Sequence, residues 1–400
     1  MRPLSYCIQM LSWLFIALIS TSRADEPAKT YPLGPELKDV PLEELEAAYP
    51  DKTGPEGIRM YMAIMRGSRM QPGDGWFGPA QSSISWKEIS EKYRFDPKAG
   101  WGREQFTGTP EWFDRLDRNR NGFITEEDLD WSDRHPWVQS SGVINRLYRK
   151  ADTSSDGQLT REEWIALFDS MAQDKQALTR TQLKEGWLAG MSSNFDPSDE
   201  PSQEVLLKGL FAGEIGSLQE GPTVGEKAPD FTLKSADGET TIHLADCLGS
   251  KPIVLCFGNF TCGPFRSTYA DVDEIAVRHR ESATFVGVYV REAHPTDGWS
   301  MKSNASAGVS VSQPKTMLER TGVAQQCFAK LKPTIPWLVD EIDDSVGHAY
   351  SGMPARLYVI DPSGKVVYKS GRGPFGFKPG EMEQALIWTL LQQRSASSGS

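Results

Sequence analysis

Residues 252–280 read PIVLCFGNFTCGPFRSTYADVDEIAVRHR, and the architecture of the C-terminal half of the chain follows from this segment. Its first six residues form an almost continuous apolar run, which is typical of a strand buried on both faces of a sheet. The turn GNFT then leads into Cys262, and the stretch STYADVDEIAVRHR after the cysteine is interpreted as a helix. The order strand, turn, cysteine, helix predicts an α/β domain that carries a thiol at the start of a helix.

Further short β-rich runs alternate with helical segments from about Val224 onward, and this alternation predicts an α/β sheet. The runs are APDFTL, PIVLCF, TFVGVYV, TIPWLVD, ARLYVID and KVVYKS. Met353-Pro354 falls where a thioredoxin-like fold places a cis-proline facing the reactive sulfur, and an ordinary trans turn proline is the alternative. We therefore predict a thioredoxin-like α/β domain over residues 224–394, which ends in the helix EMEQALIWTLLQQ, and a disordered tail over residues 395–400.

The cysteine at the predicted helix start is the strongest candidate for chemistry. Unpaired N–H groups and the helix dipole at this position favour the thiolate, so we expect a lowered pKa for Cys262; the alternative is a buried, inert thiol. Phe265 occupies the place of the second cysteine of a C-x-x-C pair, which excludes disulfide shuttling by that pair. Cys256 is expected in the core, while Cys327 and Cys247 are candidate resolving thiols.

Two segments in the middle of the chain, DRNRNGFITEED at 117–128 and DTSSDGQLTREE at 152–163, repeat one pattern of oxygen-bearing residues. This spacing is that of the EF-hand calcium loop, in which alternate residues converge on one hard cation. We name the two segments calcium loop one and calcium loop two. Their predicted ligands are the side chains of Asp117, Asn119, Asn121, Asp128, Asp152, Ser154, Asp156 and Glu163, with the backbone carbonyls of Phe123 and Gln158.

Helical segments flank both loops, so residues 105–175 are predicted to form an EF-hand pair in which Ile124 and Leu159 meet in a short two-stranded bridge. The alternative is a pair of solvated acidic turns. Loop two carries three carboxylates against two in loop one, which predicts tighter binding by loop two. In an exported protein, permanent structural occupancy by calcium is favoured over sensing.

The composition and the N-terminus bear on location and partners. The chain has 400 residues, with 43 Lys and Arg against 54 Asp and Glu, and the net charge of -11 disfavours capture of nucleic acid or of an anionic membrane. Residues 1–24 have the pattern of a secretory signal peptide, with a membrane anchor as the alternative. After its cleavage we expect a secreted or periplasmic protein without a stable membrane span.

Two regions outside the predicted domains are less informative. Residues 25–104 are expected to hold an exposed, partly ordered leader over residues 25–55 and then a helical region. Residues 176–223 are expected to form a linker and one amphipathic helix. The predicted class of the whole chain is thus α + α/β, a helical EF-hand region followed by a thioredoxin-like domain.

Four segments between Phe257 and Leu391 resemble the iodothyronine deiodinases: FGNFTCGPF, YVREAHPTDGW, AYSGMPARLYVI and YKSGRGPFGF. The resemblance implies that Cys262, which stands where most animal members carry selenocysteine, is the nucleophile. It also implies that His294, with Glu292 beside it, supplies a proton or polarises the substrate, and that Arg372 helps His294 to bind it. A halogenated aromatic substrate and an external thiol reductant are implied in the same way.

Two hypotheses follow from these patterns. The first is an exported, calcium-binding thiol oxidoreductase that uses Cys262 in reductive dehalogenation. Because sulfur is a weaker nucleophile than selenium, a thiol-dependent reduction of another substrate, such as a peroxide, is equally compatible; the reductant protein is unknown. The second is a calcium-binding structural or interaction protein whose thioredoxin-like domain is a catalytically inactive scaffold.

Overall fold

A computed structural model of the chain describes residues 30–50, 54–68, 78–154, 156–172, 176–191, 201–213, 215 and 219–397. The predicted signal peptide, residues 1–24, lies outside these ranges, as do residues 398–400 of the predicted tail. In the part of the chain that the structure describes, every helix is too short or too polar to cross a bilayer.

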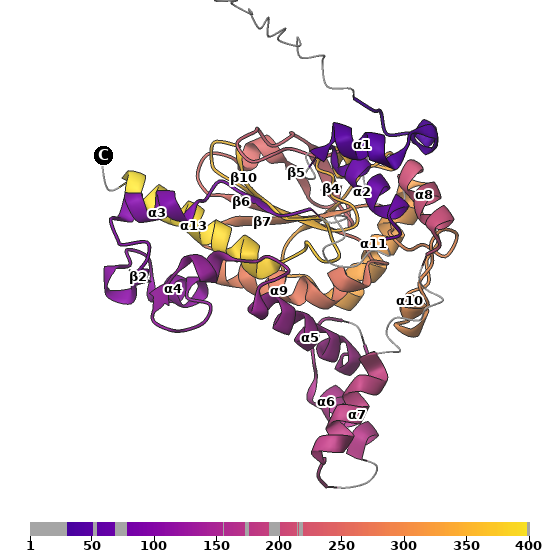
Figure 1. Ribbon diagram of the computed structural model, residues 1–400, viewed down its shortest axis with the longest axis horizontal. Coiled ribbons are helices and arrows are strands. Elements are labelled where there is room, and N and C mark those ends of the chain that lie inside the picture. The colour runs from indigo at the N-terminus through magenta and orange to yellow at the C-terminus, as the bar shows by residue number, and fades with distance from the viewer. Residues whose placement is uncertain are drawn as a thin grey trace, which may run out of the picture.

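A sheet of eight strands forms the centre of the molecule (Figure 1). In spatial order the strands are β1 (Gln81–Ser82), β10 (Val366–Lys369), β9 (Arg356–Ile360), β6 (Ile253–Gly258), β7 (Thr284–Tyr289), β8 (Trp337–Val339), β4 (Thr232–Ser235) and β5 (Thr241–His243). Strands β6, β7 and β8 are parallel, and the remaining neighbours are antiparallel. The apolar run of β6 is fully buried, as its composition predicts.

The central part of the sheet is thioredoxin-like. β6 leads through α9 (Gly263–His279) to the parallel strand β7, and the antiparallel strands β9 and β10 then precede α13 (Pro379–Ser397). α9 and α13 pack against each other, and α13 covers β9 and β10. The other helical elements of this half are η6 (Leu244–Cys247), α10 (Lys302–Ser306), α11 (Met317–Leu331) and α12 (Ser345–Ala349). The predicted fold class is confirmed.

The described part of the N-terminal segment has ordered elements whose residues are mostly exposed or half-buried, with a few apolar side chains packed inside. Its elements are η1 (Pro35–Asp39), α1 (Leu42–Ala48) and α2 (Glu56–Met65), and they share an apolar cluster with α8 (Gln203–Phe211). Leu37 and Leu45 are buried in this cluster together with Leu206 of α8. A local run rich in Pro, Glu and Lys does not reveal the few apolar side chains that find a distant partner.

Calcium loop one lies in a helix–loop–strand unit that occurs twice in succession. α3 (Trp86–Tyr93), β2 (Trp101–Gly102) and η3 (Arg103–Gln105) are followed by α4 (Pro110–Leu116), β3 (Phe123–Ile124) and η4 (Glu126–Leu129). β3 pairs with β2, so Ile124 lies opposite Trp101. The predicted bridge between Ile124 and Leu159 is therefore wrong, because loop one already has a partner immediately before it in the chain.

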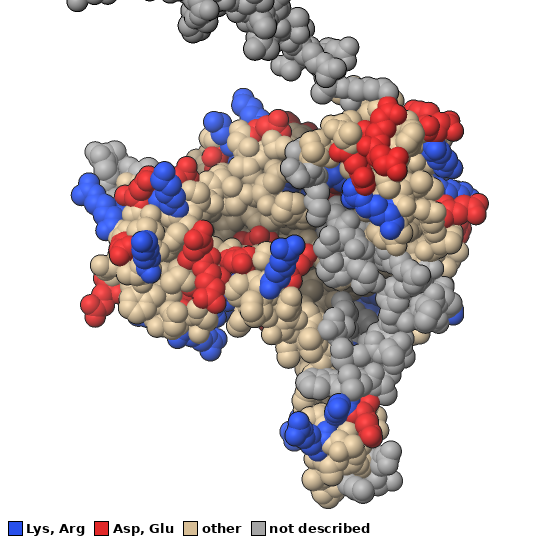
Figure 2. All heavy atoms as spheres, in the orientation of Figure 1, with Lys and Arg blue, Asp and Glu red and all other residues tan. Residues whose placement is uncertain are grey.

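Calcium loop two lies between α5 (Pro136–Ala151) and α6 (Arg161–Ala172), and α7 (Arg180–Met191) packs on both helices. α6 and α7 project from the body of the molecule, whereas α3 and α4 lie beside α13 (Figure 1). Asp and Glu side chains gather over α1, and Lys and Arg are scattered over the visible face (Figure 2). Because calcium loop one lies between α4 and η4 and calcium loop two lies between α5 and α6, the two loops belong to separate parts of the helical region.

Candidate functional site

Cys262 is the N-cap residue of α9, at the end of the turn that follows β6. Pro264 occupies the first helical turn, where a missing N–H costs nothing. The Cys262 side chain is only 2% exposed. Phe265 is equally buried, and a Cβ atom at Gly258 would overlap its ring, so the residue that replaces the second cysteine packs against the end of β6.

The ionisation of Cys262 differs from the sequence-based expectation. Burial raises the pKa of the Cys262 thiol to about 11, and the backbone N–H of Phe265 and the charge of Arg266 lower it only in part. The predicted lowering at the helix start is therefore wrong for this structure. A helix terminus favours a thiolate by fractions of a kcal/mol up to about 2 kcal/mol, which is less than the cost of moving a charge out of water.

Asn259 organises the turn before the cysteine. Its side-chain oxygen accepts hydrogen bonds from the backbone N–H of Cys262 (3.0 Å) and of Ala293 (3.2 Å), and its amide nitrogen donates to the Pro354 carbonyl (2.9 Å). The Met353-Pro354 peptide is cis, as predicted. Asn259 was not predicted as a site residue, although it stands only three residues before the cysteine.

Glu292 is buried behind the cysteine turn, with 1% of its surface exposed. Its Oε2 accepts from the Thr261 backbone N–H (2.8 Å) and lies 2.7 Å from the Thr261 hydroxyl, and its Oε1 accepts from the Tyr289 hydroxyl. Burial raises the pKa of the Glu292 carboxyl, although the hydrogen bonds from Tyr289 and Thr261 act in the opposite direction. The carboxyl is thus suited to hold a proton, and Thr261, to which it is hydrogen-bonded, is the residue before Cys262.

His294 lies next to the same turn through its backbone, because its N–H donates to the Thr261 hydroxyl oxygen (2.9 Å). Its Nδ1 lies 3.1 Å from the Trp299 carbonyl, and since a carbonyl can only accept, Nδ1 carries the proton in this bond. The indole of Trp299 meets the imidazole edge-on, with ring centroids 4.6 Å apart. The turn Glu292–His294 therefore brings two of the predicted catalytic residues to the loop that carries Cys262.

Arg372 is placed differently from the two residues above. Its guanidinium is 1% exposed and forms an ion pair with Glu56 of α2 (3.0 Å) and a hydrogen bond to the Ser351 hydroxyl (2.9 Å). Arg356 of β9 binds the same carboxylate at 3.0 Å. Burial alone would raise the pKa of Glu56, but the charges of Arg356 and Arg372 hold it well below its usual value. Nothing in the local sequence around Glu56 indicated that it is the counter-charge of two buried arginines.

The four described cysteines are all free thiols. Cys256 and Cys327 are buried, and burial raises the pKa of both, whereas Cys247 is half-buried in η6. The charge of Arg266 acts on the thiol of Cys327 as it does on that of Cys262. Of the two candidate resolving thiols, Cys327 is therefore the one that shares an electrostatic environment with Cys262.

In both calcium loops, the first and last predicted ligand residues accept hydrogen bonds from the loop backbone. In loop one the Asp117 carboxylate accepts from the N–H groups of Asn121 and Gly122, and Asp128 reaches across the loop to the N–H of Asn119 (3.2 Å). In loop two the first carboxylate again accepts from the residues at positions 5 and 6, and Glu163 reaches the N–H of Ser154 (2.9 Å). The aspartate at position 12 of loop one is thus long enough to close the loop.

The donor set fits a hard cation. Asp117, Asp128 and Asp152 are each at most 2% exposed, and within the described residues none of the three forms an ion pair with a basic side chain. Buried carboxylates without a counter-charge are costly, and a divalent cation would offset that cost. Within the described residues, no three acidic, histidine or cysteine side chains are grouped closely enough to hold a metal ion. The loops are closed instead by hydrogen bonds from backbone N–H groups.

Calcium loop two is docked on the helix that carries Cys262. Gly157, at loop position 6, has a φ of +81°, and a Cβ atom there would lie 3.0 Å from the Arg266 carbonyl oxygen and 3.4 Å from the Ala270 methyl group. The corresponding Gly122 of loop one has nothing within 4 Å of such an atom. Glycine at position 157 therefore serves the tight turn of the loop and its close approach to α9.

Loop two should contribute more calcium-dependent stability than loop one. In millimolar calcium, Asp152→Ala is expected to lower the free energy of unfolding more than Asp117→Ala, because each site contributes about 1 to 3 kcal/mol only when calcium exceeds its Kd ten- to hundred-fold, and loop two has the lower Kd. Chemical denaturation of the full chain with calcium or with a chelator measures this, because the difference between the two variants should shrink with the chelator. Calorimetry that detects no calcium binding, or a larger loss in Asp117→Ala, would contradict the expectation.

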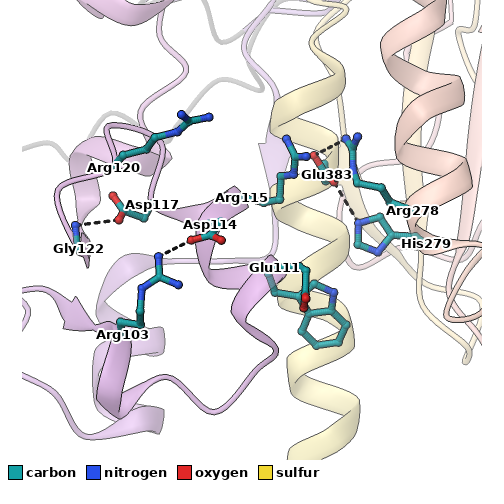
Figure 3. A pocket seen from close by; sticks show the side chains of 11 residues that line it. Arg103, Glu111, Asp114, Arg115, Asp117, Arg120, Gly122, Arg278, His279 and Glu383 are labelled. Carbon is teal, nitrogen blue, oxygen red and sulfur yellow. Dashed lines mark hydrogen bonds and ion pairs between the residues drawn. The ribbon is translucent and has the colours of Figure 1, made fainter.

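Two clefts border α9. The first, of about 650 Å³, lies between calcium loop one and the ends of α9 and α13, and it is lined by charged side chains from all three (Figure 3). In this cleft Arg103 is bonded to Asp114, and Glu383 binds both Arg278 and His279. None of the predicted catalytic residues lines it.

The second cleft, of about 750 Å³, lies between α5 and the start of α9. Pro264 and Thr268 of α9 line it, together with the aromatic rings of Trp137, Phe375 and Phe377. Cys262 does not line this cleft, but Pro264 is only two residues away. Charged side chains, among them Arg115, Asp271 and Lys378, line the same cleft, so it combines rings that suit an aromatic ligand with groups that suit polar substituents.

The two halves of the chain are similar to two different protein families. The family described as iodothyronine deiodinase matches residues 202–388, and the EF hand family matches residues 111–130 and 149–168. The thyroxine 5-deiodinase of Gallus gallus is 30% identical over 226 residues, which cover 54% of this chain and 85% of that protein. The type I iodothyronine deiodinase of Xenopus laevis is 30% identical over 166 residues, 41% of this chain and 63% of that protein.

Among solved structures, a thiol:disulfide interchange protein of the DsbE type from Chlorobium tepidum is 22% identical, with a TM-score of 0.31, and the match covers 42% of this chain and 97% of that chain. A secreted disulfide oxidoreductase of Mycobacterium tuberculosis is 16% identical, with a TM-score of 0.29 and a coverage of 40% and 95%.

Proposed function

Because the chain belongs to the iodothyronine deiodinase family, we propose that it is an exported, calcium-binding thiol oxidoreductase in which Cys262 is the nucleophile. The observation that carries this proposal is the arrangement at the start of α9. A thiol at the N-cap stands one residue after Thr261, which is hydrogen-bonded to the buried carboxyl of Glu292. A nucleophile and a proton donor are the two groups that a reductive dehalogenation requires.

The proposed reaction is the reductive removal of iodine from an aromatic ring. The Cys262 thiolate attacks the iodine atom, so that a sulfur–iodine bond forms, the carbon–iodine bond breaks and the ring carbon takes up a proton. A resolving thiol then attacks the sulfur, iodide leaves and a disulfide forms, and the external thiol reductant reduces that disulfide. The balance is one aryl iodide and two thiols consumed, with one arene, one iodide, one proton and one disulfide produced.

Glu292 is the proposed source of the proton. Its raised pKa keeps the carboxyl protonated to higher pH than an exposed glutamate, and the Thr261 hydroxyl connects it to the turn of Cys262. His294, which the same hydroxyl holds through the backbone, is proposed to orient the substrate. The cleft beside Pro264 is the proposed place for the aromatic ring.

Cys327 is the proposed resolving thiol. It lies in α11 and shares the charge of Arg266 with Cys262, whereas Cys247 lies in η6. With Cys327 as the second thiol, the sulfur–iodine bond would be resolved inside the protein and the external dithiol would reduce the resulting disulfide. Calcium is proposed to be structural, because both loops pack on the elements that frame the thiol domain.

A second candidate function is favoured by two observations. Cys262 is 2% exposed with a raised pKa, and Arg372 is bound to Glu56. Both fit a catalytically inactive scaffold in a calcium-binding interaction protein. Turnover distinguishes the two candidates, because a scaffold would not release halide.

The direct test is the release of iodide from an iodinated phenol by the full chain with excess dithiol, with a peroxide as a parallel substrate. Glu292→Gln is expected to lower kcat by about 10² to 10⁴, the range of general-acid catalysis. Activity of the wild type should rise with pH below the pKa of Glu292 and level off above it, because the gain in Cys262 thiolate is then offset by the loss of the proton donor, whereas the activity of Glu292→Gln should go on rising with pH.

Glu341→Gln is the matched control, because Glu341 is an exposed glutamate of the same domain, and its pH profile should equal that of the wild type. If the wild type released no iodide and reduced no peroxide, the scaffold would replace the enzyme. If the activity of Glu292→Gln levelled off at the same pH as that of the wild type, another group would be the proton donor.

A further inference from the structure

Arg266 is a buried cation one helical turn after Cys262. Its side chain is fixed at both ends of the guanidinium, since Nη1 donates to the Phe260 carbonyl and Nη2 donates to the Asn304 side-chain oxygen (3.0 Å). The amide of Asn304 in turn donates to the Thr261 carbonyl (2.7 Å). Arg266 and Asn304 therefore hold two consecutive carbonyl groups of the turn that leads into the cysteine.

Arg266 differs from other buried arginines of the chain in its partners. Arg320 forms an ion pair with Asp344, and Arg356 and Arg372 share Glu56. Arg266 is 3% exposed, yet throughout the described ranges no carboxylate lies within ion-pair distance of it, and its Nε has no hydrogen-bond partner. Removing an uncompensated charge from water costs several kcal/mol. An anion formed beside the Arg266 guanidinium, such as a thiolate, would offset that cost.

The groups whose charges act on Arg266 can be named. They are the thiols of Cys262 and Cys327, the carboxyl of Glu292, the hydroxyl of Tyr289 and the ammonium group of Lys330. All four acids are described in the site above, and Lys330 carries a like charge. Of these acids Cys262 is the one on the same helix, and the Arg266 backbone N–H also donates to the Cys262 carbonyl (3.1 Å).

We propose that Arg266 is a positioning residue for the reactive sulfur, which clamps the turn of Cys262 and provides the counter-charge that this buried sulfur needs as a thiolate. The inference rests on the proposed function only in taking Cys262 as the reacting thiol. Because the ionised sulfur is an intermediate of any thiol chemistry at this site, the role applies equally to an iodinated and to a peroxide substrate. When the thiol ionises, its proton leaves to solvent and the guanidinium remains charged.

The test is the rate at which iodoacetamide alkylates Cys262 in the full chain between pH 7 and pH 10, followed by mass spectrometry of the Cys262 peptide. Only the thiolate reacts, so the rate reports its population. Arg266→Met keeps the length of the side chain and removes the charge, and we expect alkylation of Cys262 to be about tenfold slower at each pH, which corresponds to a rise of one pKa unit. Arg266→Lys keeps the charge and should remain within about threefold of the wild type.

Cys247 in the same samples is the internal control, because it lies in η6 and its alkylation rate should not change. An equal or faster rate at Cys262 in Arg266→Met, with Cys247 unchanged, would overturn the counter-charge role and leave a packing role. If Arg266→Met does not fold, Arg266→Gln, which retains an amide donor for the Phe260 carbonyl, is subject to the same two outcomes. Alkylation needs no substrate, so its result is independent of whether the wild type releases iodide.

Discussion

Replacement of Glu56 by glutamine is expected to lower the free energy of unfolding by about 3 to 5 kcal/mol, because it leaves two buried guanidinium groups without a counter-charge. Arg356 and Arg372 are each at most 2% exposed, and both bind this one carboxylate. The carboxylate joins α2 of the N-terminal segment to the end of the central sheet. Urea denaturation of the full chain, monitored by tryptophan fluorescence, measures the loss.

The pH dependence of this effect has a defined sign. The pKa of Glu56 is depressed in the folded protein, so its contribution is complete above the pKa of an unfolded glutamate, near 4.5, and is lost as the pH falls further. The difference in stability between the wild type and Glu56→Gln should therefore be constant from neutral pH down to about pH 5 and shrink below it.

Glu46→Gln is the matched control for Glu56→Gln. Glu46 pairs with Arg66 at 2.7 Å, but the two side chains are 39% and 49% exposed, so the same substitution should cost less than about 1 kcal/mol. If Glu56→Gln cost no more than Glu46→Gln, Glu56 would not be the counter-charge of the buried arginines.

The second large effect is expected at the thiol. Cys262→Ser should reduce the dithiol-dependent release of iodide to the rate of the reductant alone, because a serine hydroxyl is not appreciably ionised and is a poor nucleophile for iodine. The substitution is nearly isosteric and lies at an N-cap, where serine is favoured, so the fold should persist. Thermal unfolding verifies the fold, and steady-state kinetics measures the loss.

Cys256→Ala is the matched control for the thiol. Cys256 lies on β6, six residues before Cys262, and belongs to the core. Its loss should cost stability through a small cavity but leave kcat close to that of the wild type. If Cys262→Ser retained turnover, or if Cys256→Ala abolished it in a folded protein, the assignment of the nucleophile would be wrong.

Local patterns predicted most of the elements. α3 and α4 lie where the sequence indicated helical segments, because capping residues and apolar spacing act over a single turn. The apolar run before the cysteine is the central strand β6, and each of the other β-rich runs contains a strand. The partner of β3 was predicted wrongly, since pairing of two strands depends on a register between segments that no local pattern encodes.

The candidate site was predictable only where its residues adjoin the cysteine or recur in the family. Glu292 and His294 are brought to the turn of Cys262 through Thr261, as their place in one short segment suggested. Asn259 and Arg266 lie within four residues of Cys262, but their roles follow from burial and from the atoms they bind. Glu56 is 316 residues away from Arg372, and only the folded chain brings the two charges together.

The sequence by itself determined which thiol stands at a helix start and which oxygen atoms form the calcium loops, since both depend on residue types within about a dozen positions. The tertiary structure decided the ionisation of Cys262, the partner of Arg372 and the docking of calcium loop two on α9. The physical reason is that a pKa or an ion pair depends on how completely water is excluded and on every charge nearby. Both quantities arise from segments that are distant in sequence and meet only when the chain folds.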